Sequence, residues 1–416
     1  MDYAHCFARE GSMQLIQAVA TFILTVGCAP GAVAAPAASP RAPIQAKTYT
    51  YEVLHSFGQS PGDGQYPFDE LIRSDDGNFY GAAYGGGTGV TPGTSRCEDT
   101  GTDNCGMVFR WSQAGEFSVG NFPIFSPATL FPMDAVSSSL VAGPDGRLFG
   151  TLLSQFGGVY QVGKDGSLSP VFSFDGLSTW SPLGSLALSA DGSIYGVTAD
   201  GGAYTRGVAF KIDPQGKYST IYQFGSKDTD PVAIETGLIM GPDGNLYGTS
   251  RAGGTLGEAG VGTVFRLTTA GKLTVIHTFD ILTDGEIPGR LTIGPDGNIY
   301  GFTIETANGS AATLFRVTTS GRFKIIASNL PPGPMGRPTI SADGVIYGAA
   351  NSPSSCGSVF KIKRGRVTYM HSFECAPSAD GRFPSGGLWL DSDGYLYGLT
   401  QRGGTADFGA IYRIHQ

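Results

Sequence analysis

The sequence predicts an all-β protein, a seven-bladed β-propeller of four-stranded blades, and three observations lead to this prediction. A short phrase, as in Asp243-Gly-Asn-Leu-Tyr-Gly, occurs seven times if Phe is accepted in place of Tyr. The copies start 69, 46, 52, 53, 47 and 50 residues apart, which is the length of a four-stranded blade. The composition, with 64 Gly and 25 Pro but only 15% charged residues, indicates short strands joined by tight turns.

Each copy of the phrase begins with Asp-Gly and ends with an aromatic residue followed by Gly. The copies start at Asp76, Asp145, Asp191, Asp243, Asp296, Asp343 and Asp393. Asp and Gly are the residues of a hairpin turn, since Asp bonds its own backbone and Gly accepts a positive φ. We assign the aromatic residue and the final Gly to packing between blades, and the seven Asp side chains to the turns rather than to catalysis or metal binding.

One full copy shows the four strands that we expect in a blade. They follow one another as Gly237 to Asp243, Gly244 to Thr249, Thr263 to Leu267 and Lys272 to Phe279. Aromatic and β-branched residues alternate with polar ones in the last two segments, as they do in strands that pack on one face.

The two ends of the repeat array indicate how the ring closes. The last copy ends with Ala410 to His415 after only three strands, whereas Tyr49 to Phe57 precedes the first copy and matches the fourth-strand pattern of Val367 to Phe373. We therefore expect the N-terminal strand to complete the last blade and to leave no open sheet edge.

The segment before the repeats has the features of a secretory signal. Leu15 to Gly27 is apolar but too short to span a bilayer, and Ala32-Val33-Ala34 offers a cleavage site. We expect a signal peptide over 1–34, a Pro/Ala-rich leader over 35–47 and a single propeller domain over 48–416. Export to the periplasm or the medium follows, with a lipoprotein anchored through Cys28 as the alternative.

Four cysteines remain after the expected cleavage, an even number that suits an oxidising compartment. Cys97 and Cys105 bracket a polar insertion in the first blade, where a metal site is poorly supported because no His or second Cys pair is near. A hairpin that turns at Arg364-Gly365 brings Cys356 within two positions of Cys375. We expect two disulfides, with free thiols as the alternative.

Charge and motifs exclude several classes of function. A formal net charge of -8 does not suit a phosphate backbone, so we expect no nucleic-acid partner. Asp391-Ser392-Asp393-Gly394 resembles a calcium loop but lacks the Glu twelve positions from its start. The chain contains no nucleophile elbow, P-loop, dinucleotide fingerprint or zinc-hydrolase motif, and we expect no cofactor and no metal.

The repeat unit resembles that of the GloVer (Gloeo-Verruco) tandem-repeat family. The resemblance extends from about Tyr49 to His415, with the fullest copy at Asp243 to Phe279 and a degenerate one at Asp145 to Phe174. It implies a protein built of repeats, and it implies neither an established activity nor catalytic residues.

Candidate binding residues lie on the face that carries the second-to-third strand loops and the crossings between blades. Its crossings repeat Asp-Gly-x-x-Pro, and its loops carry Gly-Gly beside charged residues. The candidates are Asp63, Asp284, Asp380, Arg251, Arg402, Arg206 and Trp180. The simpler interpretation is that Asp-Gly-x-x-Pro only turns the chain between blades. We expect His55, His277 and His371 to be structural, because they recur at one position of the fourth strand.

Two classes of function fit these residues. The first is a secreted, monomeric binding or scaffold module that recognises a glycan or an envelope protein, an inference that rests on fold analogy and on absent catalytic motifs. The second is an extracellular polysaccharide lyase or hydrolase that uses the carboxylates and arginines of this face. A purely structural envelope protein is the third possibility.

Overall fold

The computed structural model describes residues 49–60, 62–85, 107–120, 135–136, 139–153, 157–163, 166–174, 179–305, 312–351, 356–375 and 379–415. The contacts divide the chain into the units Met1–Ala46 and Lys47–Gln416, and all described residues belong to the second. The expected signal peptide, leader, Cys28 and the Cys97 and Cys105 pair lie outside the described residues.

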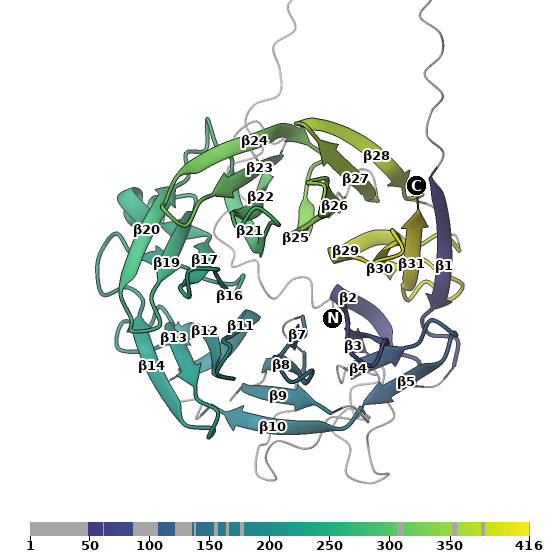
Figure 1. Ribbon diagram of the computed structural model, residues 1–416, viewed down its shortest axis with the longest axis horizontal. Helices are drawn as coiled ribbons and strands as arrows, with labels where there is room; N and C mark the ends of the chain where they lie inside the picture. The colour runs from purple at the N-terminus through teal and green to yellow at the C-terminus, as the bar shows by residue number, and fades with distance from the viewer. Residues whose placement is uncertain are drawn as a thin grey trace, which may run out of the picture. The chain divides into compact units, whose positions relative to one another are not determined.

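The described residues form seven antiparallel blades in a ring, as the repeat count predicts (Figure 1). Blade 1 consists of β2 (Gln65–Arg73), β3 (Phe79–Gly85), β4 (Met107–Trp111) and β5 (Phe117–Gly120). Blade 2 consists of β6 (Ala135–Val136), β7 (Val141–Ala142), β8 (Leu148–Leu153), β9 (Gly158–Val162) and β10 (Leu168–Ser173), with β6 and β7 both paired to β8. Blade 3 consists of β11 (Thr179–Leu188), β12 (Ile194–Gly201), β13 (Val208–Ile212) and β14 (Tyr218–Gln223).

The remaining blades follow the same order from the axis outward. Blade 4 consists of β16 (Leu238–Met240), β17 (Leu246–Ser250), β19 (Thr263–Leu267) and β20 (Leu273–Thr278). Beside it lie a small ribbon of β15 (Pro231–Val232) and β18 (Ala252–Gly253) and the 3-10 helix η2 (Gly254–Ala259). Blade 5 consists of β21 (Glu286–Ile293), β22 (Ile299–Glu305), β23 (Ala312–Val317) and β24 (Phe323–Leu330). Blade 6 consists of β25 (Pro334–Ile340), β26 (Ile346–Ala350), β27 (Ser358–Lys363) and β28 (Arg366–Ser372).

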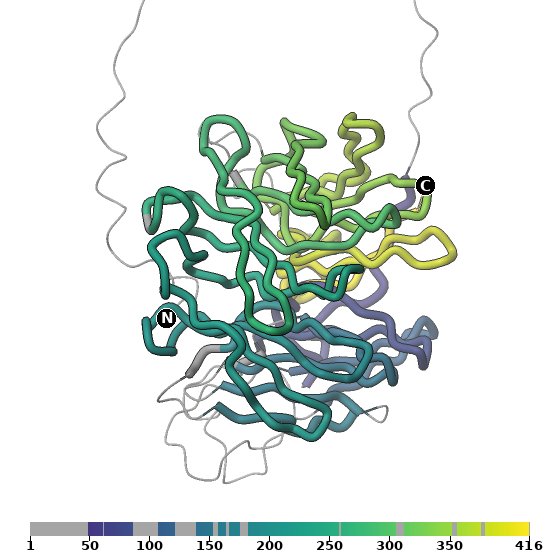
Figure 2. The backbone as a smooth tube through the Cα atoms, turned by 60° about the vertical axis from the view of Figure 1, so that its left-hand side comes forward, coloured from purple at the N-terminus to yellow at the C-terminus, as the bar shows by residue number. Residues whose placement is uncertain are grey.

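Blade 7 joins the two ends of the repeat array, and this confirms the predicted closure. Its strands are β29 (Arg382–Leu390), β30 (Leu396–Arg402), β31 (Ala410–His415) and β1 (Thr50–Ser56). Strand β1 pairs antiparallel with β31, from Thr50 opposite His415 to Ser56 opposite Ala410. Figure 2 shows the consequence, since the purple and blue strands of blade 1 lie next to the yellow strands of blade 7.

The Asp of the repeat phrase holds the turn, as predicted. Asp243 accepts hydrogen bonds from the backbone N–H of Asn245 (3.2 Å) and from its side-chain amide (2.7 Å). The hydroxyl of Tyr247 donates to the same carboxylate (2.9 Å), so the turn is tied to the aromatic residue of its own repeat. Partial burial opposes ionisation, but these hydrogen bonds outweigh it and lower the pKa of Asp243.

The final Gly of the phrase makes room for an aromatic ring from the third strand of the same blade. A Cβ at Gly248 would lie 2.5 Å from Cζ of Phe265, and one at Gly398 would lie 2.4 Å from Cζ of Tyr412. Phe265 and Tyr412 are fully buried. At these two positions the repeated Gly therefore sets how closely a ring packs on the second strand of its own blade, which corrects the expectation that it serves packing between blades.

Deleting residues 48–57 is expected to lower the melting temperature sharply. The deletion removes every backbone hydrogen bond that β1 makes to β31 and also the fully buried Phe57. Differential scanning calorimetry of the two chains measures the effect. The control is Glu52→Ala in the same strand, which removes only the exposed ion pair to Arg413. Such a surface ion pair contributes about 0–1 kcal/mol to stability. An unchanged melt after the deletion would contradict the closure.

Gly248→Ala is expected to destabilise the protein by about 1–3 kcal/mol, because the new methyl group overlaps the ring of Phe265. Urea unfolding measures this loss, and Phe265→Leu in the same chain restores part of it. The matched control is Gly244→Ala, where nothing lies within 4 Å of the added Cβ but φ is +73°. Its loss comes from the backbone conformation alone, so Phe265→Leu must not rescue it.

Candidate functional site

The three crossing aspartates each hold a histidine of the preceding outer strand. Nε2 of His55 lies 2.8 Å from Oδ1 of Asp63, and Nε2 of His277 lies 2.8 Å from Oδ2 of Asp284. Nε2 of His371 lies 3.2 Å from both carboxylate oxygens of Asp380. In blade 3 the hydroxyl of Tyr222 takes the same place, 2.9 Å from Oδ1 of Asp230.

Each of these histidines also stacks on an aromatic ring of the next blade. The ring centroid of His55 lies 4.3 Å from that of Phe117, and the centroid of His277 lies 3.5 Å from that of Phe323. His371 stacks on Tyr51 at 3.9 Å, across the junction where the ring closes. The aspartates and histidines thus join neighbouring blades, and they lie in three separate crossings.

The crossing backbone also follows the pattern of a tight turn. The residue before each proline has a left-handed conformation, with φ of 56° at Tyr66, 51° at Ile287 and 56° at Phe383. Gly64 and Gly285, which follow the aspartates, have φ of 74° and 90°. Asp-Gly-x-x-Pro therefore directs the chain from the outer strand of one blade to the inner strand of the next.

The predicted arginines lie in different blades and have different partners. Arg251 forms an ion pair with Glu235 (3.3 Å), and both side chains are about half exposed. Arg206 lies beside Gly225, where an added Cβ would come within 2.8 Å of its Cγ. Trp180 lies in β11, paired with Asp200, and its side chain is outside the described part of the structure.

Arg402 belongs to a polar cluster at the junction of blades 7 and 1. Its guanidinium lies 4.4 Å from the ring centroid of Tyr66, and Nη1 donates to the hydroxyl of that residue (3.3 Å). Asp407 lies 4.0 Å away and makes a two-pronged contact with Arg382, through Nη2 (2.7 Å) and Nε (3.2 Å). Partial burial opposes ionisation of Asp407, but Arg382 and the N–H of Gly403 outweigh it and lower its pKa.

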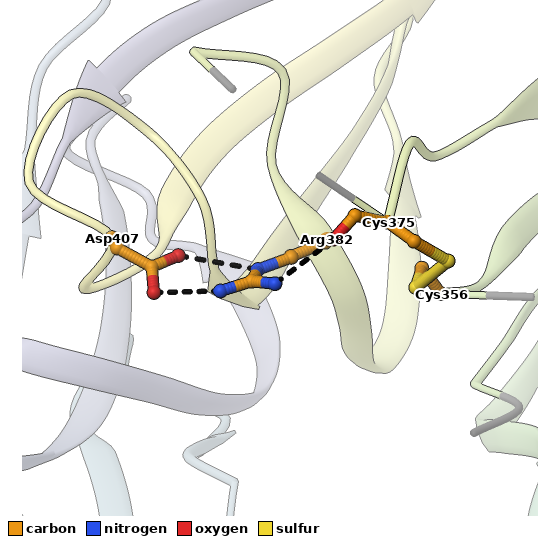
Figure 3. The surroundings of a disulfide bond; sticks show 4 residues. All are labelled: Cys356, Cys375, Arg382 and Asp407. Atoms are coloured by element: carbon orange, nitrogen blue, oxygen red, sulfur yellow. Dashed lines mark hydrogen bonds and ion pairs between the residues drawn. A yellow bond between two sulfur atoms is a disulfide. The ribbon is translucent and has the colours of Figure 1, made fainter. Parts of the chain in front are cut away.

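A disulfide lies next to Arg382 of this cluster, on the side away from Asp407 (Figure 3). Cys356 and Cys375 are bonded, which confirms that predicted pair. Nη1 of Arg382 donates to the backbone carbonyl of Cys375 (3.1 Å), so the disulfide positions one acceptor of this guanidinium. Nε, Nη1 and Nη2 of Arg382 are each hydrogen-bonded within the protein.

A second set of equivalent positions, which the sequence analysis missed, lies at the axis of the ring, and polar residues occupy five of its seven positions. Each stands ten positions before the aromatic residue of its own repeat, as Glu70 stands before Tyr80. We call this set the axial ring: Glu70, Ser139, Ser185, Gly237, Arg290, Arg337 and Gly387. Counting back from the repeat aromatic would have revealed it, because charged residues occupy three of the seven equivalent positions.

Contacts between the blades connect the members of the axial ring. Nε of Arg337 donates to Glu70 (3.0 Å), and Nη1 of Arg290 donates to Oγ of Ser139 (2.9 Å). The hydroxyls of Ser139 and Ser185 lie 3.1 Å apart, and Ser185 bridges to Gly237. A Cβ at Gly387 would lie 2.4 Å from Oε2 of Glu70, so any other residue there would displace that carboxylate.

Asp69 adds a second carboxylate and an unusual backbone. It forms an ion pair with Arg290, which comes from blade 5 while Asp69 comes from blade 1. Its φ is 68°, and the equivalent residues Gly184, Gly336 and Gly386 have φ of 69°, 67° and 69°. A side chain in this conformation costs about 1–3 kcal/mol, although Asp tolerates it better than most residues. Asp69 therefore stands where three other blades use glycine in the same left-handed conformation.

Burial controls the charges in this set. The side chains of Asp69 and Glu70 are only 6% and 2% exposed. Burial raises the pKa of Glu70, Arg337 opposes this effect and Asp69 adds to it. Burial alone would lower the pKa of Arg290, but Asp69 and Glu70 outweigh it and the pKa is raised. Arg290 thus keeps its charge.

Tyr84 is the exposed aromatic residue of this site. Its ring stacks on Phe68 with centroids 4.1 Å apart, and the residue is 48% exposed. Burial of the hydroxyl and the nearby charge of Asp69 raise the pKa of Tyr84. The site therefore combines an aromatic face, two carboxylates, two guanidinium groups and two hydroxyls.

Comparison with known proteins agrees with this fold. The architecture is that of a β-propeller, and the structure resembles a streptogramin B lyase with a TM-score of 0.57 at 16% identity, over 88% of this chain and 97% of that one. A luciferin-regenerating enzyme gives a TM-score of 0.44 at 11% identity over 88% and 95%. TolB from Acinetobacter baumannii gives 0.42 at 14% over 74% and 64%. At these identities the likeness concerns the fold.

The family follows from the sequence. The model of the Gloeobacter/Verrucomicrobia repeat matches residues 94–255 and 135–352, and the chain belongs to this repeat family. No curated protein matches the chain. Among the described residues, no helix is long and apolar enough to cross a membrane, and no three His, Cys, Asp or Glu side chains gather as metal ligands would.

The raised pKa of Glu70 predicts a pH dependence of stability. An acid whose pKa is raised by folding contributes stability below its ordinary value, 4.5 here, and loses it as the pH rises through the raised pKa. Gln at position 70 does not titrate. The free energy of unfolding of the wild type relative to Glu70→Gln should therefore fall as the pH rises from about 4 to 8. Urea titrations of both proteins test this, and a constant difference would contradict the raised pKa.

Proposed function

We propose that this protein is an exported binding module that recognises a carbohydrate at the axis of its propeller. The observation that carries the proposal is the convergence of polar side chains from several blades on Tyr84 and the axial ring. Arg290 of blade 5 contacts Asp69 of blade 1 and Ser139 of blade 2, so the polar groups of three blades meet at one guanidinium. Binding sites typically combine a few converging polar groups with an aromatic surface.

Carbohydrate is the ligand class that these groups suit best. A sugar ring has apolar C–H faces and a rim of hydroxyls, and an aromatic side chain with a polar tip complements both. Tyr84 is braced by Phe68 and close to Asp69, whose carboxylate accepts hydrogen bonds. Ser139 and Ser185 both donate and accept. A sugar stacked on Tyr84 lies beside Asp69, whose carboxylate can accept hydrogen bonds from its hydroxyls.

The observations favour binding over polysaccharide cleavage. A glycosidase uses two carboxyl groups on either side of one bond, about 5–10 Å apart. Asp63, Asp284 and Asp380 lie in three crossings, where each bonds to a histidine. Asp69 and Glu70 are adjacent in sequence, and each forms an ion pair with an arginine. The similarity to a streptogramin B lyase extends to the fold alone.

The compartment is part of the same proposal. The Cys356–Cys375 disulfide supports an oxidising environment, such as the periplasm or the medium. The apolar segment Leu15 to Gly27, which lies outside the described residues, supplies the export signal that we expect.

Tyr84→Ala is expected to weaken carbohydrate binding by about tenfold or more, since it removes the stacking surface. The full chain is first screened on an array of neutral and acidic oligosaccharides, and titration calorimetry then gives the affinities for the bound sugars. The matched control is Tyr369→Ala, because Tyr369 is 56% exposed on the outer strand β28. Absence of any bound oligosaccharide, or equal loss in both variants, would contradict the proposal.

A further inference from the structure

Arg337 differs from the other arginines that lie near the axis and the crossings. It comes from β25, and its side chain is 33% exposed although its partner Glu70 is buried. Only Nε of Arg337 donates to Glu70. Within the described residues, no hydrogen bond or ion pair is formed by its two terminal nitrogens, Nη1 and Nη2.

The neighbouring arginines are engaged through these same terminal groups. Arg290 uses Nη1 for both Asp69 and Ser139. Arg382 uses Nη2 for Asp407 and Nη1 for the carbonyl of Cys375. Of these three arginines, only Arg337 forms no hydrogen bond or ion pair through either Nη1 or Nη2 within the described residues. Two parallel N–H groups on a guanidinium match the two oxygens of a carboxylate.

From this geometry we propose that Arg337 receives the carboxylate of a uronic acid, so that the carbohydrate bound at the axis is an acidic polysaccharide. The inference rests on the function proposed above and names its ligand class. Nη1 and Nη2 of Arg337 donate to the two carboxylate oxygens, Nε remains on Glu70, and the pyranose ring lies on Tyr84. A neutral sugar or a methyl ester leaves the terminal pair without a charged acceptor.

Glu70 competes electrostatically with this ligand. Its carboxylate neutralises part of the charge of Arg337 at 3.0 Å and repels a second carboxylate brought to the same guanidinium. The buried position of Glu70, which raises its pKa, moderates this competition by favouring the neutral acid. Removing the charge at position 70 should therefore strengthen the binding of an acidic ligand while keeping the shape of the site.

The test uses oligogalacturonate, oligomannuronate and oligoguluronate, each beside its methyl ester, with the full chain in titration calorimetry. Methyl esterification removes the charge and nearly preserves the shape. We expect at least tenfold tighter binding of one of the acids than of its ester, with an affinity that falls at high salt. Arg337→Gln should abolish this preference, and Glu70→Gln should increase it.

Folding is checked by thermal melts of every variant, because Arg337→Gln removes the cation that is hydrogen-bonded to the buried Glu70. The double variant Glu70→Gln and Arg337→Gln removes both charges together, and it should bind acid and ester equally, as Arg337→Gln does. Arg322→Ala, in the exposed turn between β23 and β24, is the control for the loss of one positive charge and should keep the preference.

Each outcome bears on a different claim. Binding of acid and ester with equal affinity, weakened by Tyr84→Ala, would overturn the uronate inference and leave the carbohydrate site standing. A preference for the acid that survives in both the Arg337→Gln and the double variant would overturn the role of Arg337. Binding of neither form, nor of any neutral sugar, would overturn the carbohydrate site and the uronate inference together.

Discussion

The antiparallel pairing of β1 with β31 is the interaction on which the remaining structure depends. It joins residues about 360 positions apart in the chain and gives the last blade its fourth strand, so the edge of β31 is paired. Tyr51 of β1 stacks on His371 of blade 6, and Phe57, which follows β1, packs against Phe109 of blade 1. The closing strand therefore also fastens the blades on either side of it.

Once the ring is closed, equivalent positions of the inner strands must face one another. This geometry explains why residues as distant in sequence as Asp69 and Arg290 form an ion pair, and why Glu70 contacts an arginine of blade 6. Burying such charges is costly, and the pairing limits that cost without making the cluster a strong source of stability. Replacing buried ion pairs by well-packed apolar residues is often neutral or stabilising, so closure of the ring does not by itself explain these charges.

The strained backbone of Asp69 and the buried charges at the axis are therefore better explained by the proposed binding site than by a contribution to stability. Asp69 adopts a backbone conformation that glycine supplies in three other blades, and Glu70 is buried with a raised pKa. The crossings between blades, in contrast, follow the repeat closely. There the same His–Asp contact and the same left-handed residue before proline recur, as expected of a device that repeats with the blade. A binding site departs from the repeat, whereas a structural element follows it.

The sequence by itself determined the strands, the turns, the number of blades and the strand that closes the ring, because these depend on local patterns that recur about every fifty residues. It also determined the Cys356–Cys375 pair, since one hairpin brings both cysteines together. Only the tertiary structure decided that Asp63 bonds to His55, and that Asp69, Glu70, Arg290 and Arg337 meet at the axis. These contacts depend on the angle between blades and on the closure of the ring, and neither is contained in the pattern of any single repeat.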